Sequence, residues 1–127
     1  MPEKILITGS NSKIAKNLLK LIPKNNYTKK INSKDIDFSN IGLVKDKINF
    51  FLKFDKIFFF HSKIRTTRID FNDLNKINES IYVNLISQIY ISEYCLQNNK
   101  NVKIFFVGSE SGIKGSYDII YGLMKSA

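Results

Sequence analysis

The chain has 127 residues, and 43% of them are hydrophobic, which is enough for one domain with its own buried core over 1–127. A single cysteine, Cys95, excludes an internal disulfide, and no apolar run approaches the roughly 20 residues of a membrane span. The net charge of +9 comes from lysines scattered without a dense basic block, so we expect incidental attraction to polyanions but no specific nucleic-acid binding. The N-terminus runs into an apolar segment instead of a signal peptide, which predicts a cytoplasmic location and no membrane contact.

Apolar runs separated by turn residues predict strands that alternate with helices. We expect strands at 4–8, 27–31, 35–38, 57–60 and 102–107. We expect helices at 12–21, 40–52 and 78–97 and a further one that carries Tyr121, with loops at 61–76 and 108–116. This alternation is typical of the α/β class, with a doubly wound parallel sheet of about five strands in the order 3-2-1-4-5 and helices on both faces.

The first expected strand is followed by a turn that contains Gly9 and then by the start of a helix. Backbone N–H groups and the positive end of the helix dipole converge at such a turn, which makes it an anion site. The pyrophosphate of a dinucleotide is the usual occupant. The residues that we expect to hold it are Thr8, Gly9, Asn11, Ser12, Lys13 and Ile14.

Near the end of the sequence, Tyr121 and Lys125 stand four residues apart, so on a helix their side chains share a face. A phenol beside an ammonium is suited to proton transfer, because the positive charge favours the phenolate. Ser109 precedes Tyr121 by twelve positions, and Asn84 precedes Ser109 by twenty-five. Tyr-x-x-x-Lys alone is weak evidence in a lysine-rich chain, whereas four residue types in this order are far more specific.

Together these residues resemble the short-chain dehydrogenase/reductase family, in which a Thr-Gly turn, an Asn, a Ser and a Tyr-x-x-x-Lys follow one another in this order. Lys13 and Ala15 stand where the family usually has its second and third glycines. The resemblance implies a Rossmann-like NAD(P)-binding domain and hydride transfer between a nicotinamide and a substrate. A complete member continues through a further strand and a substrate-binding segment, so we expect the chain to be truncated after the motif.

The resemblance also implies roles for the catalytic set. Tyr121 would transfer the proton, and Lys125 would activate it and bind the nicotinamide ribose. Ser109 would position the substrate; Ser111 competes for this role, and the family's pattern around the serine favours Ser109. Asn84 would bend its helix and hold a water of the proton relay.

Three further residues are expected to line the cofactor. Asp37 and Phe38 resemble the family's strand-3 motif, whose Asp meets the adenine amino group, although an Asp that caps a helix is the alternative. His61 follows a strand at the place where the family lines its cofactor. A lone histidine is more often structural, and no cluster of Cys and His predicts a metal site.

The sequence mildly favours NADP over NAD as the cofactor. NAD sites place an acid about 20 residues past the glycine turn, where it binds the ribose 2′-hydroxyl, whereas NADP sites offer a cation there. No acid occurs between Glu3 and Asp35, and Lys29 stands twenty residues past Gly9. The alternative is that lysine is simply common throughout this chain.

We therefore expect an NAD(P)-dependent oxidoreductase that acts on a small carbonyl or alcohol. The short path from Gly9 to Asp37 resembles that of enzymes acting on sugar nucleotides in polysaccharide biosynthesis. Two alternatives stay open: a non-catalytic dinucleotide-binding module or inactive fragment, and a basic interaction protein that binds polyanions. The resemblance further implies a homodimer through the 78–97 helix and the C-terminal helix.

Overall fold

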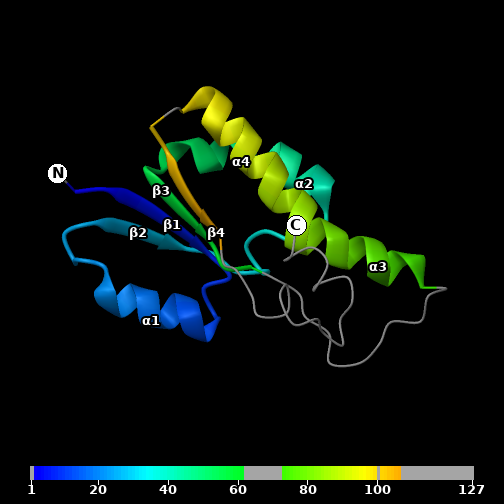
Figure 1. Cartoon of the computed structure of the whole chain (residues 1–127), viewed down its shortest axis with the longest axis horizontal. Helices are drawn as coiled ribbons and strands as arrows, with labels where there is room; N and C mark the ends of the chain where they lie inside the picture. Colours follow the sequence, from blue (N-terminus) through cyan, green and yellow to red (C-terminus); the bar gives the residue numbers. More distant parts are fainter. Residues whose placement is uncertain (1, 62–72, 100, 107–127) are drawn as a thin grey trace.

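A computed structural model describes residues 2–61, 73–99 and 101–106 (Figure 1). Within these residues, four parallel strands form one sheet in the order β2-β1-β3-β4. The strands are β1 (Lys4–Thr8), β2 (Tyr27–Lys30), β3 (Lys56–Phe59) and β4 (Lys103–Phe106). The helices are α1 (Lys13–Leu21), α2 (Ile41–Asp46), the 3₁₀ helix η1 (Ile48–Lys53), α3 (Leu74–Ile81), the π-helical turn η2 (Tyr82–Ile86) and α4 (Ser87–Asn98).

The sheet is covered on both faces, as the alternation of strands and helices predicts. Ile5 and Ile7 of β1 point to one face and pack with Ala15 of α1. Leu6 points to the other face, where it belongs to the cluster that contains Ile91 of α4. Figure 1 shows α1 on one side of the sheet and α2 and α4 on the other. The predicted α/β class and the doubly wound parallel sheet are confirmed.

The segment 35–38 is not a strand, contrary to its predicted structure. The backbone N–H groups of Asp35 and Ile36 both donate to the carbonyl of Asn32, so the chain turns on itself instead of pairing with β2. Ile36 and Phe38 are nevertheless buried in the core. Alternating apolar residues correctly indicated burial here, but turn hydrogen bonds satisfy the backbone. The other four predicted strands keep their predicted order.

Two predicted helices also differ from the observed ones. The segment 40–52 is divided into α2 and the 3₁₀ helix η1. The long helix begins at Leu74 instead of 78, because the carboxylate of Asp73 accepts a hydrogen bond from the backbone of Lys76 and caps the helix. Its middle is the π-helical turn η2. Across the described residues, every helix is too short or too polar to cross a lipid bilayer.

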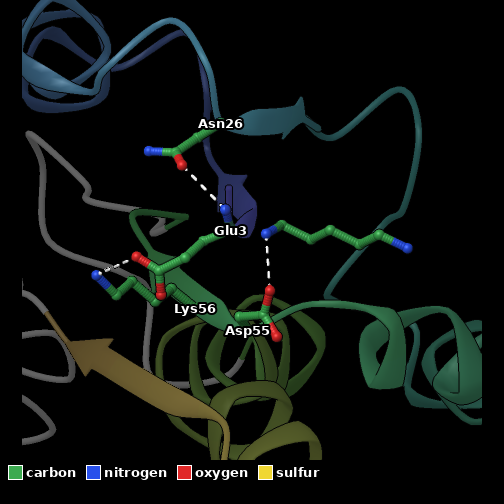
Figure 2. A network of polar contacts seen from close by, with 5 residues as sticks. Glu3, Asn26, Asp55 and Lys56 are labelled. Carbon is green, nitrogen blue, oxygen red and sulfur yellow. Dashed lines mark hydrogen bonds and ion pairs between the residues drawn. The ribbon is translucent and has the colours of Figure 1, made fainter. Parts of the chain in front are cut away.

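Polar contacts join the strands where β1 and β3 begin (Figure 2). The backbone N–H of Glu3 donates to Asn26 Oδ1 at 2.9 Å, and the carboxylate of Glu3 pairs with Lys56 Nζ at 2.9 Å. Asp55 accepts from the backbone N–H of Lys4 at 2.8 Å, and its carbonyl accepts from the backbone of Lys103. These contacts fix the amino ends of the four strands, at the edge opposite the one that carries the predicted site.

Candidate functional site

The turn between β1 and α1 has the geometry of an anion site. Gly9 has a φ of 62°, in the left-handed region, and a Cβ built on it would lie 2.6 Å from backbone atoms of Phe60 and His61. Only glycine fits where the turn approaches the end of β3 this closely. Ser12 caps α1, since its hydroxyl accepts from the backbone N–H of Ala15 at 3.1 Å. The positive end of the α1 dipole therefore faces the carboxyl edge of the sheet.

A cavity of about 520 Å³ opens at this edge. Its walls come from the β1–α1 turn, the segment after β2, the end of β3, and the helix formed by α3 and η2. The lining residues are Gly9, Asn11, Ser12, Asn32, Ser33, Asp37, Phe38, Phe60, His61, Glu79 and Val83. Cavities of this size are typical of small-molecule and cofactor sites.

Six residues predicted from the sequence line this cavity: Gly9, Asn11, Ser12, Asp37, Phe38 and His61. Thr8 lies directly beneath them and is fully buried. Lys13 and Ile14 are exposed on the first turn of α1 and are not part of the lining. Lys29 lines a second cavity of about 350 Å³, next to η1, instead of the first.

The sequence left two roles open for Asp37, which are contact with adenine and capping of a helix. Asp37 is one of the residues that line the cavity. Its carboxylate accepts hydrogen bonds from the backbone N–H and the hydroxyl of Ser39, at 3.0 and 2.6 Å. The cap of α2 is Asn40, whose side chain accepts from Leu43. Asp37 therefore orders the turn before the helix while it faces the cavity, and it does not cap the helix.

His61 is the most tightly held side chain of the site and is 7% exposed. Its Nδ1 lies 2.7 Å from Thr8 Oγ1, and its Nε2 lies 3.0 Å from Ser87 Oγ. Its carbonyl accepts from Gln88 Nε2 at 3.1 Å. Its ring stacks on Phe38 with centroids 3.7 Å apart and planes 4° from parallel. The imidazole is thus packed between β1, β3, the segment after β2, and α4.

Asn84 lies in η2 and is 3% exposed. Its Nδ2 donates to the hydroxyl of Ser80 at 3.2 Å. A π-helical turn interrupts the regular i to i+4 pattern, and such turns are frequent at functional sites. The irregularity falls where the resemblance places a helix distorted at this Asn. The other three predicted catalytic residues, Ser109, Tyr121 and Lys125, lie outside the described residues.

The sequence analysis missed two groups of residues. Asn32, Ser33, Glu79 and Val83 line the cavity, and Ser87 and Gln88 hold His61. The helix that carries Ser87 and Gln88 also contains Ser92, Glu93, Gln97 and Asn98, so nothing in the sequence singles out the two residues that hold His61. Among the described residues, no group of three or more His, Cys, Asp or Glu could hold a metal ion.

No protein-family model matches the sequence, and a search among curated proteins finds no match. Solved structures do match. A short-chain dehydrogenase family protein from Francisella tularensis is 20% identical over 99% of this chain, with a TM-score of 0.73. An alcohol dehydrogenase from Comamonas testosteroni, specific for bulky-bulky ketones, is 12% identical over 98% of this chain, with a TM-score of 0.80. The dTDP-4-dehydrorhamnose reductase from Bacillus anthracis, solved with NADP, is 18% identical over 100% of this chain, with a TM-score of 0.70.

This chain spans 59%, 62% and 48% of the length of these three proteins, respectively. At such low identity the likeness concerns the fold. The parallel sheet, the glycine turn before α1 and the cavity at the carboxyl edge agree with it. The chain therefore has the Rossmann-type α/β fold that these solved structures share.

Proposed function

We propose that this chain binds NAD(P) in the cavity at the carboxyl edge and forms the cofactor-binding part of a short-chain dehydrogenase/reductase. The observation that carries the proposal is the turn at Gly9, which joins a buried parallel strand to a capped helix and opens into a cavity of about 520 Å³. A pyrophosphate fits this position, because anions are stabilised at helix N-termini. Asn11 and Ser12 line the same wall and offer polar groups to it.

The adenosine half is assigned to the wall formed by Asn32, Ser33, Asp37 and Phe38. The Asp37 carboxylate accepts hydrogen bonds, as an adenine amino group requires. For the choice of cofactor we propose NADP. The support is the absence of an acid between Glu3 and Asp35, together with Lys34, which directly follows Ser33. We propose Lys34 as the cation for the 2′-phosphate, because Lys29 lines the second cavity.

The reaction that we propose is hydride transfer to or from a small carbonyl or alcohol, for which the nicotinamide supplies the hydride chemistry. Tyr121 would move the proton, Lys125 would favour its phenolate, and Ser109 would orient the substrate oxygen. Asn84, in the π-helical turn, would hold the relay water. A sugar or sugar-nucleotide substrate is suggested by the likeness to dTDP-4-dehydrorhamnose reductases from Clostridium acetobutylicum and Bacillus anthracis.

Titration with NADPH and NADH, followed by nicotinamide fluorescence, tests the proposed site. Asn11→Glu adds a negative charge to the cavity at an exposed position, and we expect it to weaken binding about tenfold by repelling the pyrophosphate. Asn17→Glu is the matched control, because it adds the same charge to an exposed position of α1 outside the lining. It should bind as the wild type does.

The outcomes separate the alternatives. Saturable binding that Asn11→Glu weakens, without turnover of any carbonyl, would indicate a non-catalytic binding module. Weak binding that moderate salt removes equally from all three proteins would indicate a basic polyanion-binding protein. The absence of saturable binding to the wild type would refute the proposed function.

We also propose that the chain forms a homodimer through the helix that contains α4. Ile89 and Leu96 are 51% and 47% exposed, and they lie seven residues apart on one face of α4. A second copy of this helix could cover these two aliphatic side chains, and that possibility is the basis of the proposal.

A further inference from the structure

One residue, His61, contacts three walls of the cavity at once. Its ring lies flat on Phe38, which lines the wall after β2. Through Ser87 it reaches Val83, which lines the wall formed by η2. Its backbone lies against Gly9, which lines the wall formed by the β1–α1 turn. Movement of this ring would therefore change how the walls that contain Phe38 and Val83 lie relative to the glycine turn, to which the backbone of His61 is fixed.

The hydrogen bonds around the ring define its proton positions. The hydroxyl of Ser87 donates to the carbonyl of Val83 at 3.0 Å, as a serine on a helix often does. Ser87 Oγ must then accept the hydrogen of His61 Nε2, at 3.0 Å. This assignment makes Nδ1 the acceptor for the hydroxyl of Thr8 at 2.7 Å. These bonds favour the tautomer that carries its proton on Nε2.

Thr8 completes the arrangement. Its oxygen accepts from the backbone N–H groups of Phe60 and His61, at 3.1 and 3.3 Å, so both of its lone pairs are used. Its own hydrogen can go to the carbonyl of Phe58 at 3.5 Å or to His61 Nδ1 at 2.7 Å, and the shorter distance favours His61. In the opposite tautomer, Nδ1–H would need a third acceptor site on Thr8, and Ser87 would have to leave Val83 to donate to Nε2. The arrangement with the proton on Nε2 therefore satisfies the series of hydrogen bonds that links Thr8, His61, Ser87 and Val83.

We propose that His61 is a positioning residue of the cofactor site, and that its Nε2–H tautomer sets the position of the η2 wall relative to the glycine turn. The inference rests on the proposed NAD(P) binding. His61 is not required to touch the reacting atoms. It acts through Phe38 and Val83, whose positions it fixes from β1 and α4.

Ser87→Ala is the variant that tests this role, because it removes the acceptor of Nε2–H without touching the cavity lining. We expect the dissociation constant of NADPH or NADH to rise about tenfold, as the η2 wall loses its tie to His61. Ser92→Ala is the matched control. Ser92 is a buried serine of the same helix, and the structure gives its hydroxyl no hydrogen-bond partner among the described residues. It should bind the cofactor as the wild type does.

A spectroscopic measurement distinguishes positioning from general loss of stability. His61 is the one histidine in the sequence, so ¹⁵N spectra of histidine-labelled protein report it without assignment. We expect a protonated Nε2 whose hydrogen exchanges slowly, and an Nδ1 that carries no proton. Both signals should shift when the cofactor binds. In Ser87→Ala the slow exchange should be lost, and in Ser92→Ala it should remain.

Three results would overturn the positioning role of His61. A wild-type spectrum with the proton on Nδ1, or signals that do not move on cofactor binding, would overturn it even if Ser87→Ala failed to fold. Wild-type affinity in a folded Ser87→Ala would overturn the positioning role and leave NAD(P) binding intact. If the wild type itself binds no cofactor, both the proposed function and this inference fail.

Discussion

At Gly9, the turn and the end of β3 approach so closely that a single methyl group has no space. A Cβ would lie 2.6 Å from Phe60 C and O and from His61 N, all of them backbone atoms that cannot rotate away, and φ is 62°. The left-handed conformation costs an alanine about 1 to 2 kcal/mol, and overpacking adds about 1 to 3 kcal/mol. We therefore expect Gly9→Ala to lower the free energy of unfolding by roughly 2 to 5 kcal/mol, measured by urea titration.

Gly42→Ala is a suitable comparison for this substitution. Gly42 lies inside α2, and its added Cβ would meet only the side-chain Oδ1 of Asn40, at 3.3 Å. Within a helix, alanine is more stable than glycine by roughly 0.5 to 1 kcal/mol. The close contact with Asn40 offsets part of this gain, so we expect little net change in the free energy of unfolding. Equal stability of the two alanine variants would show that Gly9 is not constrained in the way its backbone indicates.

At the residue scale, the sequence indicates correctly which residues lie together at one edge of the sheet when their position after a strand decides it, whereas their roles toward a cofactor stay predictions. Gly9, Asp37 and His61 line one cavity because residues just past the carboxyl ends of parallel strands, or of a segment beside them, meet at one edge. Lys29 was assigned by its distance from Gly9 along the chain. It lies within β2, before the strand ends, and lines the other cavity. The number of residues after Gly9 does not show whether a residue lies inside the next strand or beyond its carboxyl end, where the cavity is.

At the scale of elements, the hydrophobic pattern of a segment predicts which of its side chains are buried more reliably than it predicts the hydrogen bonds of its backbone. Residues 35–38 alternate like a strand and are buried like one, yet their N–H groups bond within a turn. The π-helical turn η2 was not predictable as such, since it depends on which carbonyl each N–H selects. The bonds of Asn84 to Ser80 and of Ser87 to Val83 lie at or beside this turn, and both join residues four apart, as in a regular helix, so their spacing does not reveal the π-helical turn.

The packing of α4 on the sheet can be followed through Cys95. This residue is fully buried, and burial raises the pKa of its thiol from 9.0 to about 11. At pH 8 we expect an aromatic disulfide reagent to modify native Cys95 at least about a hundredfold more slowly than the unfolded chain, because α4 must open first. Rapid labelling of native protein, measured by absorbance of the released thiolate, would contradict the packing of α4 on β3.

The same residue contributes a pH dependence of known sign. The folded state favours the neutral thiol, so its contribution to stability is complete below about pH 9 and is lost as the pH rises towards about 11. Lysine and tyrosine also titrate in this range, so Cys95→Ala serves as the reference. The urea midpoint of the wild type should fall more steeply between pH 9 and about pH 11 than that of the variant.

In the molecule as a whole, the two edges of the sheet carry different kinds of contacts. At the amino edge, Glu3 and Asp55 tie neighbouring strands together through backbone and side-chain bonds (Figure 2). At the carboxyl edge, the chain leaves a cavity lined by small and polar groups such as Gly9, Ser12 and Asn32. The contacts at the amino edge hold the strands in place. The residues at the carboxyl edge are therefore available to line the cavity and are not needed to hold the strands together.

The proposed homodimer makes a prediction at this largest scale. The side chains of Ile89 and Leu96 leave an exposed aliphatic row on α4, and a second copy would cover it. Ile89→Asp places a charge in that row, and an unpaired charge is costly to bury, so we expect dimer dissociation to increase at least about tenfold. Leu21→Asp, at a 78% exposed position of α1, adds the same charge outside this face and should leave the mass unchanged. Size-exclusion chromatography with light scattering over a range of concentrations measures both. A wild type that stays monomeric throughout, or an Ile89→Asp variant that dimerises as well as Leu21→Asp, would remove α4 as the interface.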